Sequence, residues 1–234
     1  MQKQNIVVLT GAGISAESGL QTFRGAGGLW NGYKIEEVAS IDAWYHNPQR
    51  VLDFYNMRRA DAMQAQPNAA HKALAELEQY HHVQIITQNV DDLHERGGST
   101  KVLHLHGKLR EVRSSQYANL IYDIGGEPIK LGDKCEGGAQ LRPNIVWFGE
   151  MVPLMEDAME LTSTADLLLV VGTMLTVYPA ASLIHYVRRN TPIYLVDPAP
   201  NKEAIRGIRN LTICAENATL AVPALVEQWT KNGI

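Results

Sequence analysis

Glycine residues follow an apolar run near the start of the chain, in a spacing that suits phosphate binding. The sequence IVVLT leads directly into Gly11–Gly19 (GAGISAESG). A strand, then glycines, then a helix start lets backbone N–H groups approach an anion closely. The same pattern also describes a tight strand-to-helix turn that binds nothing, so that alternative stays open for this motif taken alone.

The position of acidic residues argues against a dehydrogenase-type cofactor geometry. In that geometry an acid stands about 20 residues after the glycines, at the end of the second strand. Residues 30–38 instead resemble loop and helix, although they include Glu36 and Glu37. Asp197 follows a much later apolar run, and we expect it to bind ribose hydroxyls if its strand lies near the glycine loop.

A polar cluster, Gln88-Asn89-Val90-Asp91-Asp92, follows the apolar run VQIIT. Asn89 and Asp91 suit an amide ligand, because one can donate to its carbonyl and the other can accept from its NH2 group. The alternative is that these residues only cap a helix, a position that Asn and Asp favour.

Two histidines occur in the sequence Leu103-His104-Leu105-His106-Gly107. Alternation predicts that His104 and His106 share one face of a short strand. A histidine at a strand end beside a crevice can act as a general base, because its ordinary pKa lies near neutrality. No serine or cysteine is placed as its nucleophile partner, so the sequence does not support a hydrolase triad.

These polar segments follow apolar runs that we predict to be strands. Continuous Ile, Val and Leu runs are typical of parallel strands covered on both faces. The predicted strands are Ile6–Thr10, Val83–Thr87, Ile145–Phe148, Leu167–Val171 and Ile193–Val196, and the predicted helices are Val51–Met63, His71–Gln79, Pro179–Arg189 and Pro223–Lys231. Their alternation predicts an α/β fold with a Rossmann-like, doubly wound parallel sheet.

Two segments interrupt the alternation and predict a smaller inserted domain. The pattern of residues 29–68 predicts helices and no strand, whereas residues 110–143 are irregular and polar. We expect these two segments to pack together beside a Rossmann-like domain made of residues 1–28, 69–109 and 144–234.

Bulk composition excludes several classes of function. A net charge of −4 gives no basic field for nucleic acid or an anionic membrane. The two cysteines do not form a secreted disulfide framework, and neither a signal peptide nor an apolar run of membrane-spanning length is recognisable. We therefore expect a cytoplasmic protein. Its oligomeric state is left open, with a monomer among the alternatives.

Taken together, five ordered motifs resemble the sirtuin family of NAD-dependent protein lysine deacylases. They are GAGISAESGLQTFR (Gly11–Arg24), TQNVDDLHERGG (Thr87–Gly98), HLHG (His104–Gly107), VWFGE (Val146–Glu150) and VGTMLTVYPAA (Val171–Ala181). Because they span most of the chain in order, the combination is far more specific than any one motif.

The resemblance implies a role for each motif. His106 would be the catalytic base. The implied NAD-binding residues are Gly11, Ala12, Gly13, Ile14, Glu17, Ser18, Phe23, Arg24, Gln88, Asn89, Val90, Asp91, Gly172, Thr173, Met174, Asp197 and Ala218. The residues Val146, Trp147, Phe148, Gly149 and Glu150 would offer a strand edge to an acyl-lysine peptide. The implied products are free lysine, nicotinamide and O-acyl-ADP-ribose.

Tyr55 and Arg58 give an indication of the acyl group. They are three residues apart on a predicted helix and therefore share a face. Their spacing resembles the class III branch of the family, whose members accept succinyl-, malonyl- or glutaryl-lysine. A guanidinium and a phenol suit the carboxylate of such an acyl group. The alternative is a solvated helix face or a local ion pair.

The chain departs from the family at the structural zinc site, which two C-x2-C pairs usually form. The aligned positions hold Ser114, Tyr117, Cys135 and Gly138. One thiolate cannot replace four, so we expect no structural zinc. We expect a small apolar core in its place, made of Tyr117, Ile121, Tyr122 and Ile129.

Two lesser departures concern the cofactor side. Asp197 stands where asparagine is common, and Met174 where serine is common. Two alternative functions remain at this level, namely an NAD hydrolase or ADP-ribosyltransferase, and a non-catalytic module that binds NAD or ADP-ribose.

Overall fold

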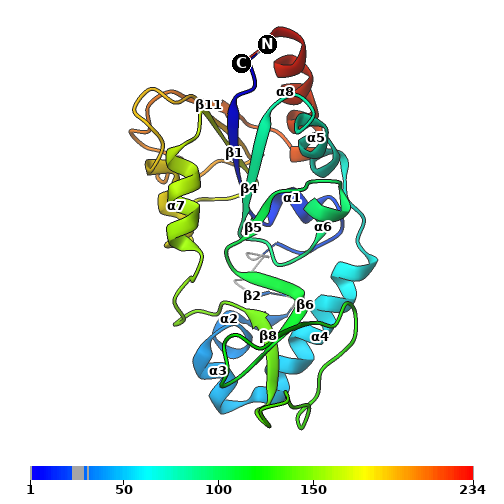
Figure 1. Cartoon of the computed structure of the whole chain (residues 1–234). Helices are drawn as coiled ribbons and strands as arrows, with labels where there is room; N and C mark the ends of the chain where they lie inside the picture. The colour runs from blue at the N-terminus through cyan, green and yellow to red at the C-terminus, as the bar shows by residue number, and fades with distance from the viewer. Residues whose placement is uncertain (1, 23–28, 31, 234) are drawn as a thin grey trace.

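The structure is a computed structural model that describes residues 2–22, 29–30 and 32–233. Its centre is a six-stranded parallel sheet in the order β11-β10-β9-β1-β4-β5 (Figure 1). The strands are β1 (Asn5–Thr10), β4 (His82–Thr87), β5 (Val102–His104), β9 (Leu167–Val171), β10 (Ile193–Val196) and β11 (Leu211–Cys214). The predicted fold class, a Rossmann-like doubly wound α/β sheet, is confirmed.

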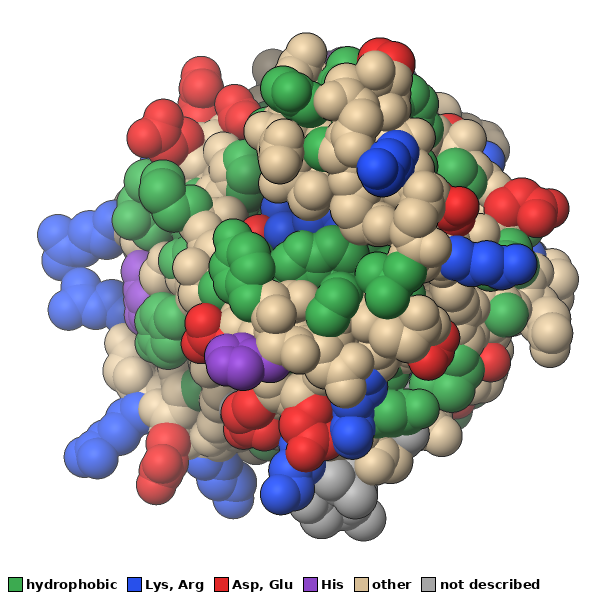
Figure 2. Space-filling view, turned by 90° about the horizontal axis from the view of Figure 1, so that it is seen from below, with side chains coloured by type: hydrophobic (Ala, Val, Ile, Leu, Met, Phe, Trp, Pro, Cys, Tyr) green, Lys and Arg blue, Asp and Glu red, His purple; other side chains and the backbone are tan. Residues whose placement is uncertain are grey.

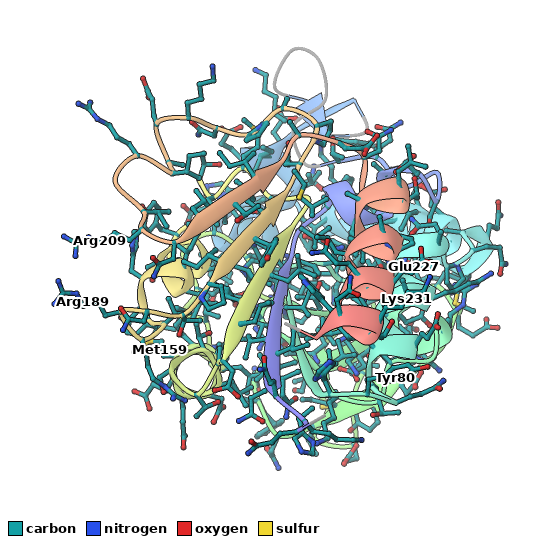
Figure 3. All side chains as sticks on the ribbon, turned by 90° about the horizontal axis from the view of Figure 1, so that it is seen from above. Tyr80, Met159, Arg189, Arg209, Glu227 and Lys231 are labelled. Carbon is teal, nitrogen blue, oxygen red and sulfur yellow. The ribbon has the colours of Figure 1, made fainter. Side chains whose placement is uncertain are left out.

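Helices cover both faces of this sheet because its strands are apolar on both sides. From β1, Ile6 and Val8 pack in a core with α5 (Ala69–Leu77) and α8 (Ala218–Asn232). Val7 and Leu9 point the other way, into a core with α7 (Met155–Ser163) and the 3-10 helix η1 (Ala180–His185). Figure 3 looks down on these layers, with α8 on one side of the strands and α7 on the other.

A second group of elements lies below the sheet in Figure 1, and we call it the small module. It contains α2 (Ile35–Val38), α3 (Ile41–His46), α4 (Pro48–Gln64) and an antiparallel sheet in the order β7-β6-β8. The strands of that sheet are β6 (Gly107–Ser114), β7 (Ile121–Asp123) and β8 (Leu141–Ile145). One apolar core joins its helices to its strands. Figure 2 views this end of the molecule, where hydrophobic side chains gather centrally and most charged ones lie toward the edge.

The small module contains strands that the sequence did not predict. A two-stranded ribbon, β2 (Leu29–Trp30) with β3 (Tyr33–Lys34), occupies part of the segment predicted to hold no strand. Its signal was the Asn-Gly dipeptide at 31–32, which is typical of tight hairpins. In the segment 110–143, β6 was missed because an irregularity between Gly107 and Val112 breaks its side-chain alternation.

Two predicted elements differ from those observed. The predicted strand Ile145–Phe148 is wrong, because β8 runs from Leu141 and ends at Ile145. The predicted helix Pro179–Arg189 is a six-residue 3-10 helix, since its hydrogen bonds join residues three apart, as from Ser182 N–H to the carbonyl of Pro179. In the described part of the chain, no helix has both the length and the apolar character to cross a membrane.

The predicted miniature core of the zinc-less segment is also wrong. Tyr117 and Ile121 are about half exposed, whereas Ile129 and Tyr122 pack into the main core of the small module. Their partners are helix α4 and strands β6 and β8, which offer a larger apolar surface than the segment could bury by itself.

Hydrogen bonds connect all four positions that align with zinc ligands, and one of them runs from Gly138 N–H to the Cys135 carbonyl. The Cys135 thiol donates to Ser114 Oγ at 3.3 Å, and Ser114 Oγ also accepts the backbone N–H groups of Gln116 and Tyr117. Among the described residues, no three His, Cys, Asp or Glu side chains are placed to hold a metal ion together. The lack of zinc and the predicted domain limits stay predictions.

Candidate active site

A cavity of about 510 Å³ lies between the carboxyl ends of the parallel strands and the small module. β1 is hydrogen-bonded to β4 on one side and to β9 on the other, so the chain leaves the sheet in two directions at this point. Such a switch point is where open α/β sheets bind ligands. The residues after β1, β4, β9 and β10 all contribute to the wall of the cavity.

The glycine loop packs directly against the loop that follows β9. Gly13 N–H donates to the carbonyl of Gly172 at 2.9 Å, and a Cβ added at Gly13 would stand 2.6 Å from Gly172 Cα. Gly172 itself has a φ of +62°. Side chains are therefore excluded at both positions, and the backbone of the two loops forms the floor of the cavity.

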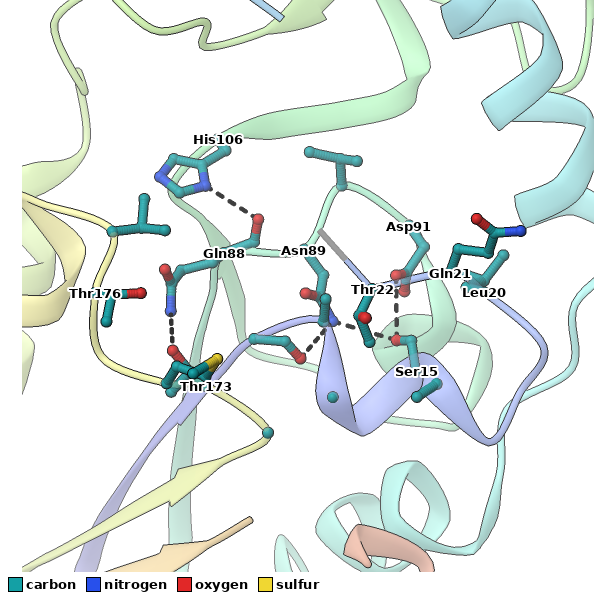
Figure 4. A pocket seen from close by; sticks show the side chains of 18 of the residues that line it. Ser15, Leu20, Gln21, Thr22, Gln88, Asn89, Asp91, His106, Thr173 and Thr176 are labelled. Carbon is teal, nitrogen blue, oxygen red and sulfur yellow. Dashed lines mark hydrogen bonds between the residues drawn. The ribbon is translucent and has the colours of Figure 1, made fainter. Parts of the chain in front are cut away.

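The polar cluster after β4 is organised by Ser15, which no sequence pattern indicated as a site residue (Figure 4). Asn89 Nδ2 donates to the Gly11 carbonyl and to Ser15 Oγ, and Ser15 Oγ donates to Asp91 Oδ2 at 3.2 Å. Both Nδ2 hydrogens of Asn89 are thus used within the protein. Asn89 can offer a ligand only its Oδ1, so it accepts rather than donates.

Asp91 is buried, and burial raises its pKa, while hydrogen bonds from Leu93 N–H and Ser15 and the charges of His104 and Arg58 oppose that rise. Asp91 Oδ1 accepts the N–H of Leu93, two residues on, in the turn that leads into the short helix α6 (Leu93–Arg96). The N-cap residue of α6 is Asp92, whose side chain makes no capping hydrogen bond, so capping does not account for Asp91, which faces the cavity.

His106 faces the cavity from the turn between β5 and β6 (Figure 4). Its Nδ1 lies 3.1 Å from the carbonyl oxygen of Gln88, an acceptor, so Nδ1 carries the hydrogen. Nε2 then keeps its lone pair. Burial lowers the pKa of His106, against the hydrogen bond to Gln88, which raises it. The neutral ring is therefore available as a base at neutral pH.

His104 does not share the role of His106. β5 ends at His104, so the two rings do not lie on one strand face as predicted, and His104 points into the protein. Its ring contacts the Asn89 carbonyl and the Glu95 carboxylate.

Tyr55 and Arg58 both face the cavity from α4, beside Trp147. The Tyr55 and Trp147 ring centroids are 6.0 Å apart. Burial raises the pKa of Tyr55, so its phenol stays protonated, and burial lowers the pKa of Arg58, whose charge interacts with Tyr55 and Asp91. This part of the cavity therefore combines the Tyr55 phenol and the Arg58 guanidinium with the apolar ring of Trp147.

The segment 146–150 is held mainly by contacts inside the chain. Phe148 N–H donates to the Ala39 carbonyl, and Trp147 N–H donates to Glu150 Oε2 at 2.9 Å. Arg142 binds both Glu150 oxygens, at 2.7 and 2.9 Å, and its guanidinium stacks on Trp147. The Glu150 carboxylate therefore braces this turn, while Gly149 turns the backbone with a φ of +89°.

The opposite end of the cavity is formed by Asp197, after β10, and by Ala218, at the start of α8. Asp197 accepts the N–H of Ala199, which makes a tight turn. Glu17 also lines this region, and its carboxylate accepts the N–H and the hydroxyl of Thr219. An acid near the first turn of α8 is favourable there because the helix N-terminus carries partial positive charge.

Nearly all of the predicted site residues that the structure describes line this one cavity. Ile14 and Ser18 are the exceptions: Ile14 packs in the sheet core, and Ser18 accepts a hydrogen bond from Asn68. Phe23 and Arg24 lie outside the described residues. The cavity also includes Ser15, Gln21, Thr22, Thr176 and Tyr178, which have no distinctive spacing in the sequence.

Comparisons with known proteins agree with this geometry. A model of the Sir2 family matches residues 11–179. The NAD-dependent protein deacylase of Helicobacter pylori is 52% identical over 228 residues, which cover 96% of each chain. The protein of the same name from Bacteroides thetaiotaomicron is 50% identical over 202 residues, covering 84% of this chain and 86% of the other.

Solved structures give the same result. A Sir2 homologue in complex with NAD superposes with a TM-score of 0.88 at 41% identity, covering 100% of this chain and 92% of the other. A Sir2 structure with a p53 peptide and NAD+ has a TM-score of 0.79 at 30% identity, covering 98% of this chain and 95% of the other. The chain belongs to the Sir2, or sirtuin, family.

Proposed function

We propose that this chain is an NAD-dependent protein lysine deacylase whose substrates include succinyl- and malonyl-lysine as well as acetyl-lysine. The deacylase activity follows from family membership and from the relatives of that name. The main support for this reaction is the neutral imidazole of His106, which can act as a base and faces the same cavity as Asn89 and Asp91.

The residues present fit NAD. The cavity extends along the carboxyl edge of the sheet, from Asp197 and Ala218 at one end to Asp91 and His106 at the other. The middle of the cavity is lined by backbone, because Gly13 and Gly172 have no side chains, and this leaves room for phosphate groups. Asp197 can accept from ribose hydroxyls, and Asp91 can accept from the NH2 group of a carboxamide.

Bound NAD supplies the sugar carbon that receives the acyl oxygen. The part of His106 is to accept a proton at Nε2, while its Nδ1–H stays bonded to the Gln88 carbonyl and fixes the plane of the ring. Asn89 and Ser15 hold Asp91 in place, so that this side chain can orient the leaving amide. Walls of Trp147 and Val146 limit the access of water to the reacting groups.

The peptide that carries the acyl-lysine would lie along the turn 146–150. Because Trp147 and Phe148 use their N–H groups inside the chain, we expect Gly149 to provide the backbone contacts. Recognition through backbone groups places little demand on substrate sequence.

Tyr55 and Arg58 support a dicarboxylic acyl group as substrate. An acetyl group would leave the charge of Arg58 without an added anion, whereas a succinyl carboxylate would lie beside both the guanidinium and the phenol. The relevant interaction is a charge-assisted hydrogen bond in a buried pocket.

The test compares NAD-dependent removal of acetyl and succinyl groups from one peptide. His106→Ala should abolish both activities. Arg58→Met should lower kcat/KM for the succinyl peptide by roughly 10- to 150-fold, the equivalent of about 1.5–3 kcal/mol, with little effect on the acetyl peptide. Arg50→Met, an exposed substitution on the same helix, is the matched control.

Equal losses on the two peptides would contradict the acyl assignment while leaving the deacylase intact. NAD consumption without acyl transfer would instead indicate an NAD hydrolase or ADP-ribosyltransferase. Cytoplasmic location stays a prediction.

A further inference from the structure

His104 and Glu95 form a buried pair behind the polar cluster, outside the residues that line the cavity. The His104 side chain is 3% exposed. Its Nε2 lies 2.8 Å from Glu95 Oε1, and its Nδ1 lies 3.2 Å from the carbonyl oxygen of Asn89. One ring thus connects helix α6 to the segment that follows β4.

Both ring nitrogens of His104 face acceptors. A peptide carbonyl can only accept, and so can an ionised carboxylate. Burial disfavours ionisation of Glu95, but the hydrogen bond and charge of His104, with a smaller contribution from Lys108, outweigh it and lower the pKa of Glu95 to about 2. Glu95 is therefore a carboxylate at neutral pH. The Nδ1 of His104, which faces a peptide carbonyl, carries a hydrogen and donates it to Asn89.

Asn89 is fixed on three sides as a result. Its N–H donates to Thr87 Oγ1 at 3.0 Å, its carbonyl accepts from His104, and its side-chain Nδ2 is bound to Gly11 and Ser15. The Oδ1 atom is the part of Asn89 left for a ligand. Its direction depends on the orientation of the Asn89 peptide groups, which His104 and Thr87 set.

Further charged and titratable groups surround His104. Asp91 and Glu95 interact with it favourably, and the ring of His94 does so unfavourably. Lys108 Nζ lies 3.4 Å from Glu95 Oε1, the oxygen that His104 also contacts. The ring of His104 therefore lies near two carboxylates, one of which, Asp91, faces the cavity.

We propose that His104 is a positioning residue: its buried ring, paired with Glu95, holds the Asn89 carbonyl and so sets the nicotinamide-binding face of residues 88–91. This proposal rests on the proposed function, in which these residues bind the nicotinamide end of NAD. His104 touches neither the cofactor nor the acyl group, so removing it should weaken NAD and nicotinamide binding without a matching effect on the peptide.

The first test observes the ring directly in the wild-type protein. Nitrogen-15 NMR of the histidine side chains should show a hydrogen on Nδ1 of His104, bonded to the Asn89 carbonyl, and on Nδ1 of His106. Glu95→Gln, which keeps a hydrogen-bonding group beside the ring, should leave the hydrogen of His104 on Nδ1. A wild-type His104 without a hydrogen on Nδ1 would overturn the proposal whether or not the enzyme deacylates any peptide.

The second test separates positioning from general damage. His104→Ala should raise KM for NAD and the nicotinamide inhibition constant by about tenfold each, the effect of losing one buried hydrogen bond, with KM for the acyl peptide within about twofold. His104→Gln should recover part of the loss, since its amide can donate to the carbonyl. His46→Gln, which changes an exposed histidine, is the control.

Unchanged constants for NAD and nicotinamide in His104→Ala, or an equal rise in all three constants, would overturn the positioning role. A wild-type protein without any NAD-dependent deacylation would instead reject the proposed function, and the NMR result would still decide the state of His104. If His104→Ala does not fold, His104→Gln and the wild-type spectrum carry the test.

Discussion

Acidification should destabilise this protein through His71, a fully buried histidine near the start of α5. Its Nδ1 accepts the backbone N–H of Asn68, whose side chain caps the same helix. The neutral ring therefore carries its hydrogen on Nε2, which has no hydrogen-bond partner among the described residues. Protonation of Nδ1 would place a charge in the core and break the bond to Asn68.

The size of the effect follows from the pKa of His71. Burial lowers this pKa from 6.5 to about 4. Because the folded value lies below the unfolded one, the stabilisation is fully present above pH 6.5 and is lost as the pH falls toward 4. The full difference corresponds to about 3 kcal/mol, and roughly 2 kcal/mol of it should be lost by pH 5. That is a large share of the stability of a typical domain.

The assay is urea unfolding followed by circular dichroism at pH 7.5 and pH 5.0. His71→Gln has no ring to protonate, so its stability should fall by about 2 kcal/mol less than that of the wild type over this interval. His46→Gln, at an exposed position, should behave as the wild type does. Equal acid sensitivity of the wild type and His71→Gln would refute the reasoning.

Three further predictions concern the site and the small module. Burial lowers the pKa of His106 and the base acts when neutral, so the acid limb of kcat/KM against pH should lie below pH 6.5; a limb at or above pH 7 would count against this assignment. Gly107→Ala should lower the free energy of unfolding in urea by about 2 kcal/mol or more, because its Cβ would lie 1.8 Å from the Asn144 carbonyl oxygen at a φ of +81°. A variant as stable as the wild type would contradict this. Ser114→Ala should lower the free energy of unfolding by about 1–3 kcal/mol, because Cys135 and two backbone N–H groups lose their partner. Metal chelators should leave the stability of the wild type unchanged. Metal analysis that finds one zinc per chain would contradict this prediction.

The central sheet could be predicted because its strands are buried on both faces. Leu167–Val171 and Ile193–Val196 match their predicted bounds, since each is a continuous apolar run that ends directly before a glycine or an aspartate. The residues that follow such runs then meet at one edge, and this is why Asp91, Gly172 and Asp197 could be placed in one cavity.

The small module was less predictable because its structure depends on contacts distant in sequence. β6 lacks regular alternation, and the strand predicted at 145–148 is a turn stabilised by the side chain of Glu150. Glu150 stabilises this turn through its contact with Arg142, and the sequence gives no sign of that contact. Ser15 was missed, and the contacts of His104 were not predicted, for the same reason: their partners Asp91 and Asn89 are 76 and 15 residues away along the chain.

The position of His106 at a crossing between two layers has a mechanical consequence. Immediately before it, the chain belongs to β5 of the large sheet, and directly after it, at Gly107, the chain enters the small module. Its own carbonyl accepts the N–H of Val146, so the segment by which the chain leaves β8 is tied to this residue. A swing of the small module hinged at these two segments would pivot close to the imidazole. A peptide bound between the layers would then shift the walls around the base more than the base itself, and the proton acceptor would stay in register with the sheet.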